Sequence, residues 1–451
     1  MMKSYNSYKE SGIKWLGEIP EHWNIIRLKR VSLVVNGSTP ESSNSEYWDG
    51  DINWVTPLDL GLLNGKKEIG GSSRKITQFG LNNCGTSITP KGSIILSTRA
   101  PIGHLAVSGV ETCTNQGCKT IVVNQEEVNN SFLYYYLLAF KEILQSLGQG
   151  STFIELSSPN LKDLVITCPN ILEQQFISEY LDRKTAQIDT LIGKKQRQIE
   201  LLQEQRTAII NQAVTKGLDP SAPMKDSNVE WLGEIPRHWD IKPIKYLKAP
   251  EENSFVDGPF GSNLKSIHYV ENGEVYVIES GLITTGVFVF SELKTISLEH
   301  FESIKRSECK IDDIIIAKIG ARYGTSGILP DLEKKCVVSG NALKLTVNGL
   351  ICSNKYIHYQ LLHLKLNTGA MDIIVNTTAQ PALSLSRLND LRLAVPPKDE
   401  QDEIVDYLDR VLKNVDEIIS YVHREISLYQ EYRASLISEA VTGKIDVRGE
   451  A

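Results

Sequence analysis

The sequence lacks the features that would place it in a membrane or in an oxidising compartment. Its most apolar stretch, residues 132–140, contains three tyrosines and is far shorter than the roughly 20 residues of a membrane-spanning helix. The first residues contain no apolar segment of the kind found in a secretory signal. The seven cysteines form no Cys-x-x-Cys pair and have no zinc spacing with histidine. We therefore expect reduced thiols, no metal, no membrane partner and a cytoplasmic location.

The sequence also lacks the short motifs that mark common catalytic sites. It has no Gly-x-x-x-x-Gly-Lys-Ser/Thr phosphate loop, no Gly-x-Gly-x-x-Gly, no Gly-x-Ser-x-Gly and no His-Glu-x-x-His. Its one Pro-Pro pair, residues 396–397, lacks the preceding Asp or Asn and the following aromatic residue with which an amino-methyltransferase holds a flipped base. We therefore predict that the chain is not an enzyme.

A basic excess is missing as well, since the net charge of the 451 residues is −7. The acidity is uneven, however: residues 400–440 contain ten acidic and four basic side chains, whereas residues 13–157 and 229–384 are nearly neutral. Because local charge matters more than the sum, these two blocks can still carry basic faces for an anionic partner such as DNA.

The feature that is present is an internal repeat. Trp-Leu-Gly-Glu-Ile-Pro-Glu-His-Trp at residues 15–23 returns at residues 231–239 with eight of nine positions identical, the exception being Glu21 against Arg237. We call these two segments the repeated nonapeptides. Further matches follow at growing offsets, and Tyr180-Leu181-Asp182-Arg183 recurs 227 residues later. The ends of the repeated unit therefore match well, whereas its middle does not.

Each repeat divides into a part with short strands and a part with one long helix. Residues 93–97 and 313–317 are compact apolar runs bounded by Gly, Pro or Asp, which is typical of buried strands. The aromatic segment 132–147 predicts a single helix whose rings pack in the core. Proline is then absent from residues 170–219 and from residue 398 onward, so each repeat is expected to end in a helix of roughly 60 Å.

The two long helices carry apolar side chains at alternating steps of three and four, which is the spacing of a coiled coil. Two successive steps of four, near residues 195 and 422, predict a local unwinding of the supercoil. The alternative is that each helix packs only on its own globular part. The predicted pairing positions are Ile188, Leu191, Ile199, Leu202, Val415, Ile418, Ile426 and Tyr429.

Connectivity then predicts a mixed α/β chain with two globular domains separated by two long antiparallel coiled-coil helices, related by an approximate two-fold axis. The second helix must return toward the first globular part, so the helices run antiparallel. The expected boundaries are residues 1–168 and 229–396 for the globular domains, 169–217 and 397–447 for the helices, and 218–228 for a linker.

Loops of both globular parts place basic side chains beside hydroxyl and amide groups. Arg can bind guanine edges through two hydrogen bonds, Asn can bind adenine, and Lys, Ser and Thr can bind phosphates. Taken singly, each of these is also an ordinary solvated residue. The candidate DNA contacts are Ser38, Thr39, Arg74, Lys75, Arg99, Ser262, Asn263, Lys265, Lys318, Arg322 and Tyr323.

These features together resemble the specificity subunit of type I restriction-modification systems, from about residue 13 to residue 447. The resemblance rests on the repeated Trp-Leu-Gly-Glu-Ile-Pro segment, the block from Thr39-Pro40 to Thr56-Pro57, the block at residues 257–262, and the helix openings at residues 173–177 and 400–404. One departure is that Gln380 fits the family pattern, whereas Phe153 stands at the corresponding place in the first repeat.

The resemblance implies two target-recognition domains, each of which reads one half of a split, asymmetric sequence in double-stranded DNA. It implies that the helices are a spacer and the docking site for two methyltransferase subunits, and that a restriction subunit with motor and nuclease activity joins for cleavage. S-adenosylmethionine, ATP and Mg²⁺ would then bind those partners and not this chain.

Two other functions remain open at this point. The chain could be a coiled-coil scaffold whose globular parts bind proteins and not DNA, or an enzyme that methylates DNA alone. Salt-dependent binding to a bipartite duplex separates the scaffold from a DNA reader, because phosphate contacts release counterions. The shared ends of the repeats are expected to build the frame, and the dissimilar middles to read the two half-sites.

Overall fold

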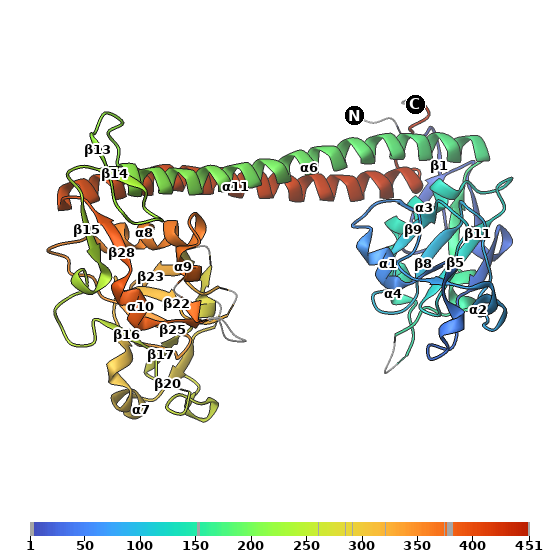
Figure 1. Cartoon of the computed structure of the whole chain (residues 1–451). Coiled ribbons are helices and arrows are strands. Elements are labelled where there is room, and N and C mark those ends of the chain that lie inside the picture. Colours follow the sequence, from blue (N-terminus) through green and yellow to red (C-terminus); the bar gives the residue numbers. More distant parts are fainter. Residues whose placement is uncertain are drawn as a thin grey trace. The chain divides into compact units, whose positions relative to one another are not determined.

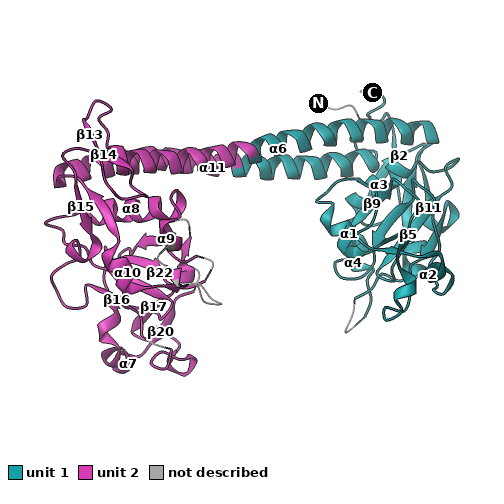
Figure 2. Cartoon of the chain, viewed as in Figure 1, with its two compact units in different colours: residues 1–196, 423–451 teal, residues 197–422 magenta. Residues whose placement is uncertain are grey.

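The computed structural model describes residues 4–150, 154–259, 261–284, 286–290, 292–320, 322–373, 375–376 and 382–449. The chain divides into two compact units (Figure 2), one formed by residues 1–196 with 423–451 and the other by residues 197–422. Both units combine small β-sheets with short helices and with parts of the two long helices α6 and α11 (Figure 1). The mixed α/β class predicted from the sequence is confirmed.

The first unit is built on a five-stranded sheet and a three-stranded sheet. The larger sheet has the order β4-β11-β8-β9-β6, and the smaller has the order β10-β5-β7. Two further strand pairs, β1-β2 and β3-β12, lie outside these sheets. The strands are β1 Tyr8–Glu10, β2 Glu18–Pro20, β3 Asn24–Arg27, β4 Ser32–Asn36, β5 Trp48–Val55, β6 Glu68–Ile69, β7 Lys75–Ile76, β8 Ile94–Ser97, β9 Leu105–Ser108, β10 Cys113–Thr114, β11 Cys118–Val123 and β12 Val165–Cys168.

The second unit repeats this plan with two four-stranded sheets, β16-β25-β22-β23 and β20-β17-β24-β21. Its remaining strands form the pairs β13-β14, β15-β28, β18-β19 and β26-β27. The strands are β13 Met224–Asp226, β14 Glu234–Pro236, β15 Asp240–Pro243, β16 Phe255–Asp257, β17 Val275–Ile278, β18 Ile283–Thr284, β19 Val287–Phe288, β20 Lys294–Ile296, β21 Glu308–Cys309, β22 Ile314–Ala317, β23 Ser326–Ile328, β24 Lys335–Val338, β25 Ala342–Leu345, β26 Val375–Asn376, β27 Ala382–Leu383 and β28 Arg392–Val395.

The short helices begin where the sequence offers a cap. Thr56, for example, caps α1 and forms a capping box with Asp59, and Asn129 accepts two backbone N–H groups at the start of α3. The α-helices are α1 Pro57–Leu62, α2 Gln78–Asn82, α3 Asn130–Ala139, α4 Lys141–Ser146, α5 Ser158–Lys162, α6 Ile171–Lys216, α7 Leu298–Ser303, α8 Asn354–Leu366, α9 Ala370–Ile373, α10 Leu385–Asp390 and α11 Lys398–Val441.

The predicted strands at residues 93–97 and 313–317 are confirmed as β8 and β22, both fully buried. The single helix predicted over residues 132–147 is wrong, because α3 ends at Ala139 and α4 begins at Lys141. The backbone of Phe140 leaves the helical region, with φ −106° and ψ 31°. Its ring packs against Trp15 at a centroid distance of 4.6 Å. Helix propensity cannot predict this contact, because Trp15 is distant in the sequence.

The long helices lie side by side in each unit and run antiparallel. In the first unit Asp189 pairs with Arg433 at 2.9 Å, and Lys195 pairs with Glu425 at 2.8 Å. The partner number falls as the residue number rises, which fixes the direction. In the second unit Arg206 pairs with Asp416 at 3.3 Å, at the positions that correspond to the first of these pairs. The predicted antiparallel pairing is confirmed.

The predicted pairing positions need one correction. Ile188, Ile199, Val415 and Ile426 are buried, and Leu202 and Tyr429 are half-buried. Leu191 and Ile418, however, are 41% and 43% exposed. Their neighbours Ile192 and Ile419 are half-buried instead.

The two successive steps of four therefore fall at residues 184–188–192 and 411–415–419, about two turns before the predicted place. A seam at steps of three and four cannot follow the 3.6-residue period of a helix indefinitely. The sequence offers two adjacent apolar residues at each of these points, so the pattern alone does not decide which one faces the partner helix.

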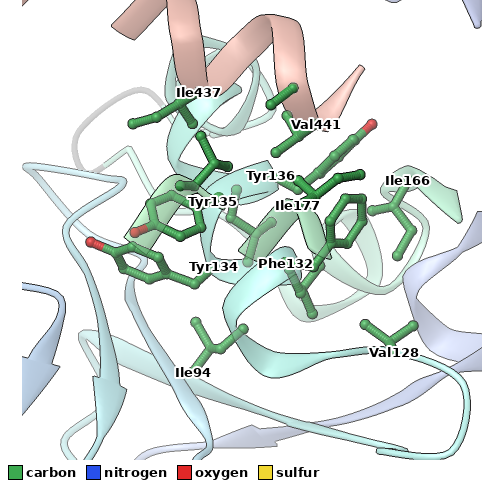
Figure 3. Close-up of a cluster of buried hydrophobic side chains, with 14 of the residues drawn as sticks. Ile94, Val128, Phe132, Tyr134, Tyr135, Tyr136, Ile166, Ile177, Ile437 and Val441 are labelled. Atoms are coloured by element: carbon green, nitrogen blue, oxygen red, sulfur yellow. The ribbon is translucent and has the colours of Figure 1, made fainter. Parts of the chain in front are cut away.

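The main core of the first unit forms around α3 (Figure 3). Phe132 and Tyr136 are fully buried, and they lie among Ile94 of β8, Ile177 of α6 and Val441 of α11. Burying each large apolar side chain contributes about 1.5–3 kcal/mol relative to exposure. The tyrosines of this segment are therefore core residues, as the sequence predicts.

The repeated nonapeptide fixes the first turn of a long helix in each unit. In the first unit Trp23 is fully buried, and its indole Nε1 donates to Glu173 Oε1 at 3.1 Å. His22 Nε2 lies 2.9 Å from the other oxygen of the same carboxylate. In the second unit Trp239 donates to Glu400 at 3.0 Å. A carboxylate in a first turn also favours the positive end of the helix dipole.

The same nonapeptide contacts the last turn of the other long helix. In the first unit Lys444 Nζ, just beyond the end of α11, donates to the carbonyl of Glu18 at 2.7 Å. In the second unit Lys216 Nζ, at the end of α6, donates to the carbonyl of Glu234 at 3.1 Å. Glu18 and Glu234 are equivalent positions of the repeat, so each nonapeptide binds the start of one helix and the end of the other.

Gly443 closes this contact in the first unit, and its substitution is expected to destabilise the chain. Its φ is +73°, and a Cβ atom would lie 2.4 Å from Pro20 and 3.1 Å from Trp23. Gly443→Ala should lower the free energy of unfolding by about 1–3 kcal/mol, because left-handed backbone strain and overpacking add. Urea unfolding followed by tryptophan fluorescence measures this.

Two alanine variants serve as controls. Gly12 has a φ of +70° and open space around it, so Gly12→Ala reports backbone strain alone. Gly449 has open space and no left-handed backbone, so Gly449→Ala should change the free energy of unfolding by less than about 0.5 kcal/mol. Equal stability of the Gly443 and Gly449 variants would contradict the packing described.

Candidate DNA interface

Three strands of the first unit bring their ends together at one edge of the five-stranded sheet. β4 and β8 end there, and β11, antiparallel to both, begins between them. The adjoining loops are tied by backbone hydrogen bonds, from Gly37 N–H to the carbonyl of Cys118 at 3.3 Å and from Thr98 N–H to the carbonyl of Gly117 at 2.8 Å. We call this edge, with loops 36–41, 98–103 and 115–117, the first loop edge.

The second unit contains the same edge. β16 and β22 end where β25 begins. Gly258 N–H donates to the carbonyl of Ala342 at 3.1 Å, and Lys318 N–H donates to the carbonyl of Asn341 at 2.9 Å. We call this edge, with residues 257–259, 261–265, 318–320 and 339–341, the second loop edge. The two loop edges share one backbone frame.

A glycine at the corresponding place keeps both edges closed. A Cβ atom on Gly37 would lie 1.9 Å from the carbonyl oxygen of Asn115, and one on Gly258 would lie 1.9 Å from the carbonyl oxygen of Ser339. Neither site has space for a side chain, so the two loops can approach only with glycine.

The first loop edge holds two cations against one carboxylate. Arg99 Nε donates to Glu155 Oε2 at 2.9 Å, and Lys119 Nζ lies 3.2 Å from Glu155 Oε1. Burial by itself would raise the pKa of Glu155, but hydrogen bonds from Arg99 and Lys119 outweigh it and hold this pKa below its ordinary value. The three groups together carry one positive charge at neutral pH.

The second loop edge repeats this balance with different residues. Lys318 Nζ donates to Asp257 Oδ2 at 3.0 Å, and Arg306 Nη2 donates to Asp257 Oδ1 at 2.9 Å. Burial would raise the pKa of Asp257, but Lys318 and then Arg306 outweigh it, so this pKa is also lowered. The carboxylate ends β16 here, whereas in the first edge it follows α4, so the side chains differ although the frame agrees.

The predicted residues Ser38 and Thr39 lie in the first loop edge. The carbonyl of Ser38 accepts a hydrogen bond from Trp54 Nε1 at 2.9 Å, and the Thr39 hydroxyl donates to Gln116. Arg74 and Lys75 follow on β7 and its preceding loop, and both are exposed. The guanidinium carbon of Arg74 lies 3.7 Å from the ring centroid of Trp48.

The predicted residues Ser262, Asn263 and Lys265 lie in a largely exposed loop that follows Asp257. Ser262 Oγ donates to Asn263 Oδ1 at 3.2 Å, and the backbone N–H of Lys265 donates to His268 Nδ1 at 3.1 Å. These side-chain contacts are local, but the loop is anchored by Leu264, which packs on the core beside β17 and β20, and by the Asn263 carbonyl, which lies 2.9 Å from His300 Nε2.

Arg322 and Tyr323 are tied to their own unit. Arg322 Nη1 donates to the carbonyl of Gly281 at 3.0 Å and lies 3.2 Å from Thr284 Oγ1. The Tyr323 hydroxyl donates to Asp372, and Lys365 Nζ lies 3.8 Å from the centroid of the tyrosine ring. These contacts hold a neighbouring loop, so the two residues are less free than the prediction assumes.

The sequence prediction does not include Lys119, Glu155, Asp257 and Arg306. Lys119 could have been noticed in the sequence, since it is a charged residue within the apolar strand 118–123. In the structure its side chain is only 6% exposed. Nothing in the sequence marks Glu155 or Arg306, because each lies far along the chain from its partner. Glu155 is 36 residues from Lys119, and Arg306 is 49 residues from Asp257. Phe153 and Gln380, which mark the departure between the repeats, lie outside the described residues.

The described ranges contain neither a metal cluster nor a membrane span. Within them no group of three or more His, Cys, Asp or Glu side chains could hold a metal ion. No helix in these ranges combines the length and the apolar character needed to cross a bilayer.

The sheets, the helix pairs and the loop edges define the class of the protein. It is a binding protein with two repeated units, whose backbone frames are similar and whose loop side chains differ. Residues 20–201 and 262–427 match the family described as type I restriction modification DNA specificity domain. The chain belongs to this family, which confirms the resemblance seen in the sequence.

Similar proteins support the same assignment. The chain is 27% identical to the type I restriction enzyme MjaIX specificity subunit of Methanocaldococcus jannaschii, over 98% of this chain and 96% of the relative. It is 19% identical to the EcoKI specificity subunit of Escherichia coli K12, over 96% and 92%. Such relatives favour a specificity subunit over a protein-binding scaffold and agree with a chain that is not an enzyme.

Two solved structures share the fold. One chain, from work on the complex assembly and conformational transition of the type I R-M system, has a TM-score of 0.71 at 14% identity and covers 94% of this chain and 98% of its own length. The HsdS subunit from Thermoanaerobacter tengcongensis has a TM-score of 0.51 at 14% identity, with 95% and 98% covered.

Glu155 should matter for stability as well as for charge. Glu155→Gln leaves the nearly buried Lys119 without its anion, so we expect the free energy of unfolding at pH 7 to fall by about 1–3 kcal/mol. The depressed pKa means that the carboxylate stabilises the fold above the ordinary glutamate pKa of about 4.3 and loses this contribution as pH falls through the folded value.

The difference in free energy of unfolding between wild type and Glu155→Gln should therefore shrink below about pH 4, the ordinary glutamate range. Urea titrations at neutral pH and in this acidic range measure it. Glu126→Gln, at an exposed position outside the loop edge, is the control and should show no such pH dependence. A difference that stays constant with pH would contradict the role of the carboxylate.

Proposed function

We propose that this chain reads a bipartite, asymmetric target in double-stranded DNA, with one loop edge for each half-site. The proposal is carried by one observation: the loop edges share a backbone frame and a cluster of two cations around one carboxylate, but present different side chains. A common frame suits one ligand class, and different side chains suit two different half-sequences. Membership of the DNA specificity family supports the same function.

The charge balance explains how an acidic chain can bind DNA. Each edge places two cations around one carboxylate, so each of these clusters carries one positive charge although the whole chain has a net charge of −7. The carboxylates also hold the long cationic side chains in place, which reduces the entropy lost when DNA binds. Phosphates supply affinity and base edges supply specificity.

We also propose that the parts shared by the repeats dock the partners. Each unit presents the same nonapeptide, and the same helix ends bound to it, so a partner that recognises one unit can recognise the other. This arrangement fits two methyltransferase subunits bound on the helices, with restriction subunits joining for cleavage. S-adenosylmethionine, ATP and Mg²⁺ would belong to those partners, and the helices would set the gap between half-sites. The cytoplasm, where cellular DNA is accessible, is the proposed location.

A matched pair of substitutions tests the assignment of one loop edge to each half-site. The wild-type chain, assembled with its methyltransferase subunits, first selects its target from a pool of random duplexes. Arg99→Gln should then weaken binding to that duplex by about 5- to 30-fold and relax preference in one half-site only. Lys318→Gln should do the same in the other half-site.

Lys14→Gln is the control, since it removes the same charge from an exposed position, just before the repeated nonapeptide, that loop readout does not use. It should leave the selected sequence unchanged. The dependence of binding on salt should be steep for the wild-type complex, with a slope of roughly −0.9 for each phosphate contacted. Loss of both half-site preferences through either single substitution would contradict one loop edge for each half-site.

A further inference from the structure

We infer that Arg74, stacked on Trp48, is the residue that specifies a guanine in the half-site read by the first unit. The inference rests on the proposed DNA-reading function and assigns one base to one side chain. It starts from a structural contrast: the other predicted arginines donate to polar groups of their own unit, whereas among the described residues the guanidinium group of Arg74 contacts only aromatic rings.

The guanidinium group lies on a platform of two tryptophans. Its carbon is 3.7 Å from the centroid of the Trp48 ring and 5.7 Å from that of Trp54. The two indoles meet edge to face, with centroids 5.0 Å apart and an interplanar angle of 81°. At these distances the attraction of the cation for the ring keeps the planar group over Trp48.

The platform is itself fixed by hydrogen bonds from both indoles. Trp48 Nε1 donates to the carbonyl of Glu41 at 3.2 Å, and Trp54 Nε1 donates to the carbonyl of Ser38 at 2.9 Å. Both rings are buried, and their acceptors belong to loop 36–41 of the first loop edge. The platform therefore joins Arg74 to the edge that contains Thr39 and Arg99.

The backbone of Arg74 is fixed as well. Ser72 Oγ donates to the carbonyl of Arg74 at 2.6 Å and accepts the backbone N–H of Trp54 at 2.9 Å. The start of the side chain and its charged end are thus both positioned before any ligand arrives. Such preorganisation reduces the rotamer entropy that a long side chain loses on binding.

The edge of the guanidinium group remains free for a ligand. Stacking uses the π face of the group, so the five N–H donors in its plane stay available. Among the described residues no carboxylate, carbonyl or hydroxyl accepts a hydrogen bond from these donors. The side chain of Arg74 is also exposed, so a ligand can reach it. Arg99, by contrast, donates to Glu155, and Arg322 donates to the carbonyl of Gly281.

A fixed, planar pair of donors selects guanine over the other bases. In the major groove guanine presents two acceptors, O6 and N7, at the spacing of one guanidinium fork. Adenine replaces one of these acceptors with an amino donor, and the pyrimidines offer no such pair. A phosphate would also accept two hydrogen bonds, but contact with a phosphate carries no preference among base sequences.

Target selection with the full chain and its methyltransferase subunits tests the inference, with a random duplex pool as the probe. Arg74→Ala should remove preference at one G·C pair in one half-site, which corresponds to about 5- to 150-fold lost discrimination. Arg74→Lys should lose the same preference, because it retains the charge but not the planar fork. Lys75→Ala, at the adjacent exposed position, should weaken binding without changing the selected sequence.

The other positions of the same half-site show whether the first unit remains folded in each variant, and the other half-site shows that the complex still assembles. An unchanged sequence in both half-sites with Arg74→Ala would overturn the role of Arg74 and leave the proposed function in place. A uniform loss of affinity for Arg74→Ala, with every base preference retained, would assign Arg74 to a phosphate and overturn the inference. If the wild-type complex selected no sequence, both the inference and the proposed function would fail.

Discussion

The structure depends on one carboxylate in the first turn of each long helix. Glu173 accepts from the indole of Trp23 and lies within hydrogen-bond distance of His22, and Glu400 repeats both contacts. The adjacent glutamine, Gln174, donates to the carbonyl of Pro169 before its own helix and to the carbonyl of Glu127 in the loop before α3. Glu173 is buried, and a buried carboxylate is costly unless its lone pairs are satisfied, so in the first unit the nonapeptide and the helix start must remain together.

Each nonapeptide also binds the end of the other helix, and this double contact explains what the duplication preserves. Glycines with left-handed backbone, Gly443 and Gly217, bring the chain against Trp23 and Trp239. Tyr135 and Tyr359 donate to equivalent aspartates, Asp182 and Asp409, so helix and globular part are also joined alike. Contacts that build the frame are therefore repeated, because a frame has to work in the same way in both units.

The loop edges follow a different rule, because the two units share the backbones of these edges but not their side chains. Gly37 and Gly258 admit no side chain, and the hydrogen bonds around them are the same in both units. Beyond them the groups vary: one edge uses Glu155 to hold its cations, and the other uses Asp257. Arg74 shows a third solution, in which an aromatic platform positions the cation and leaves all its donors to a ligand. A fixed backbone with exchangeable charges allows one fold to read different sequences.

The sequence by itself determined the duplication, the α/β class, the buried strands and the antiparallel helix pair. Each of these follows from the spacing of apolar residues or from the order of the repeats along the chain. It also indicated Arg99 and Lys318 as candidates, since both lie in predicted loops and Arg99 stands beside hydroxyl groups. Only the tertiary structure decided that Glu155 and Arg306 join them, that Phe140 interrupts a helix, and that Ile192 replaces Leu191 in the helix seam. These outcomes depend on contacts between residues far apart in the chain, or on a choice between two equally apolar neighbours. The spacing of residues along the sequence predicts neither.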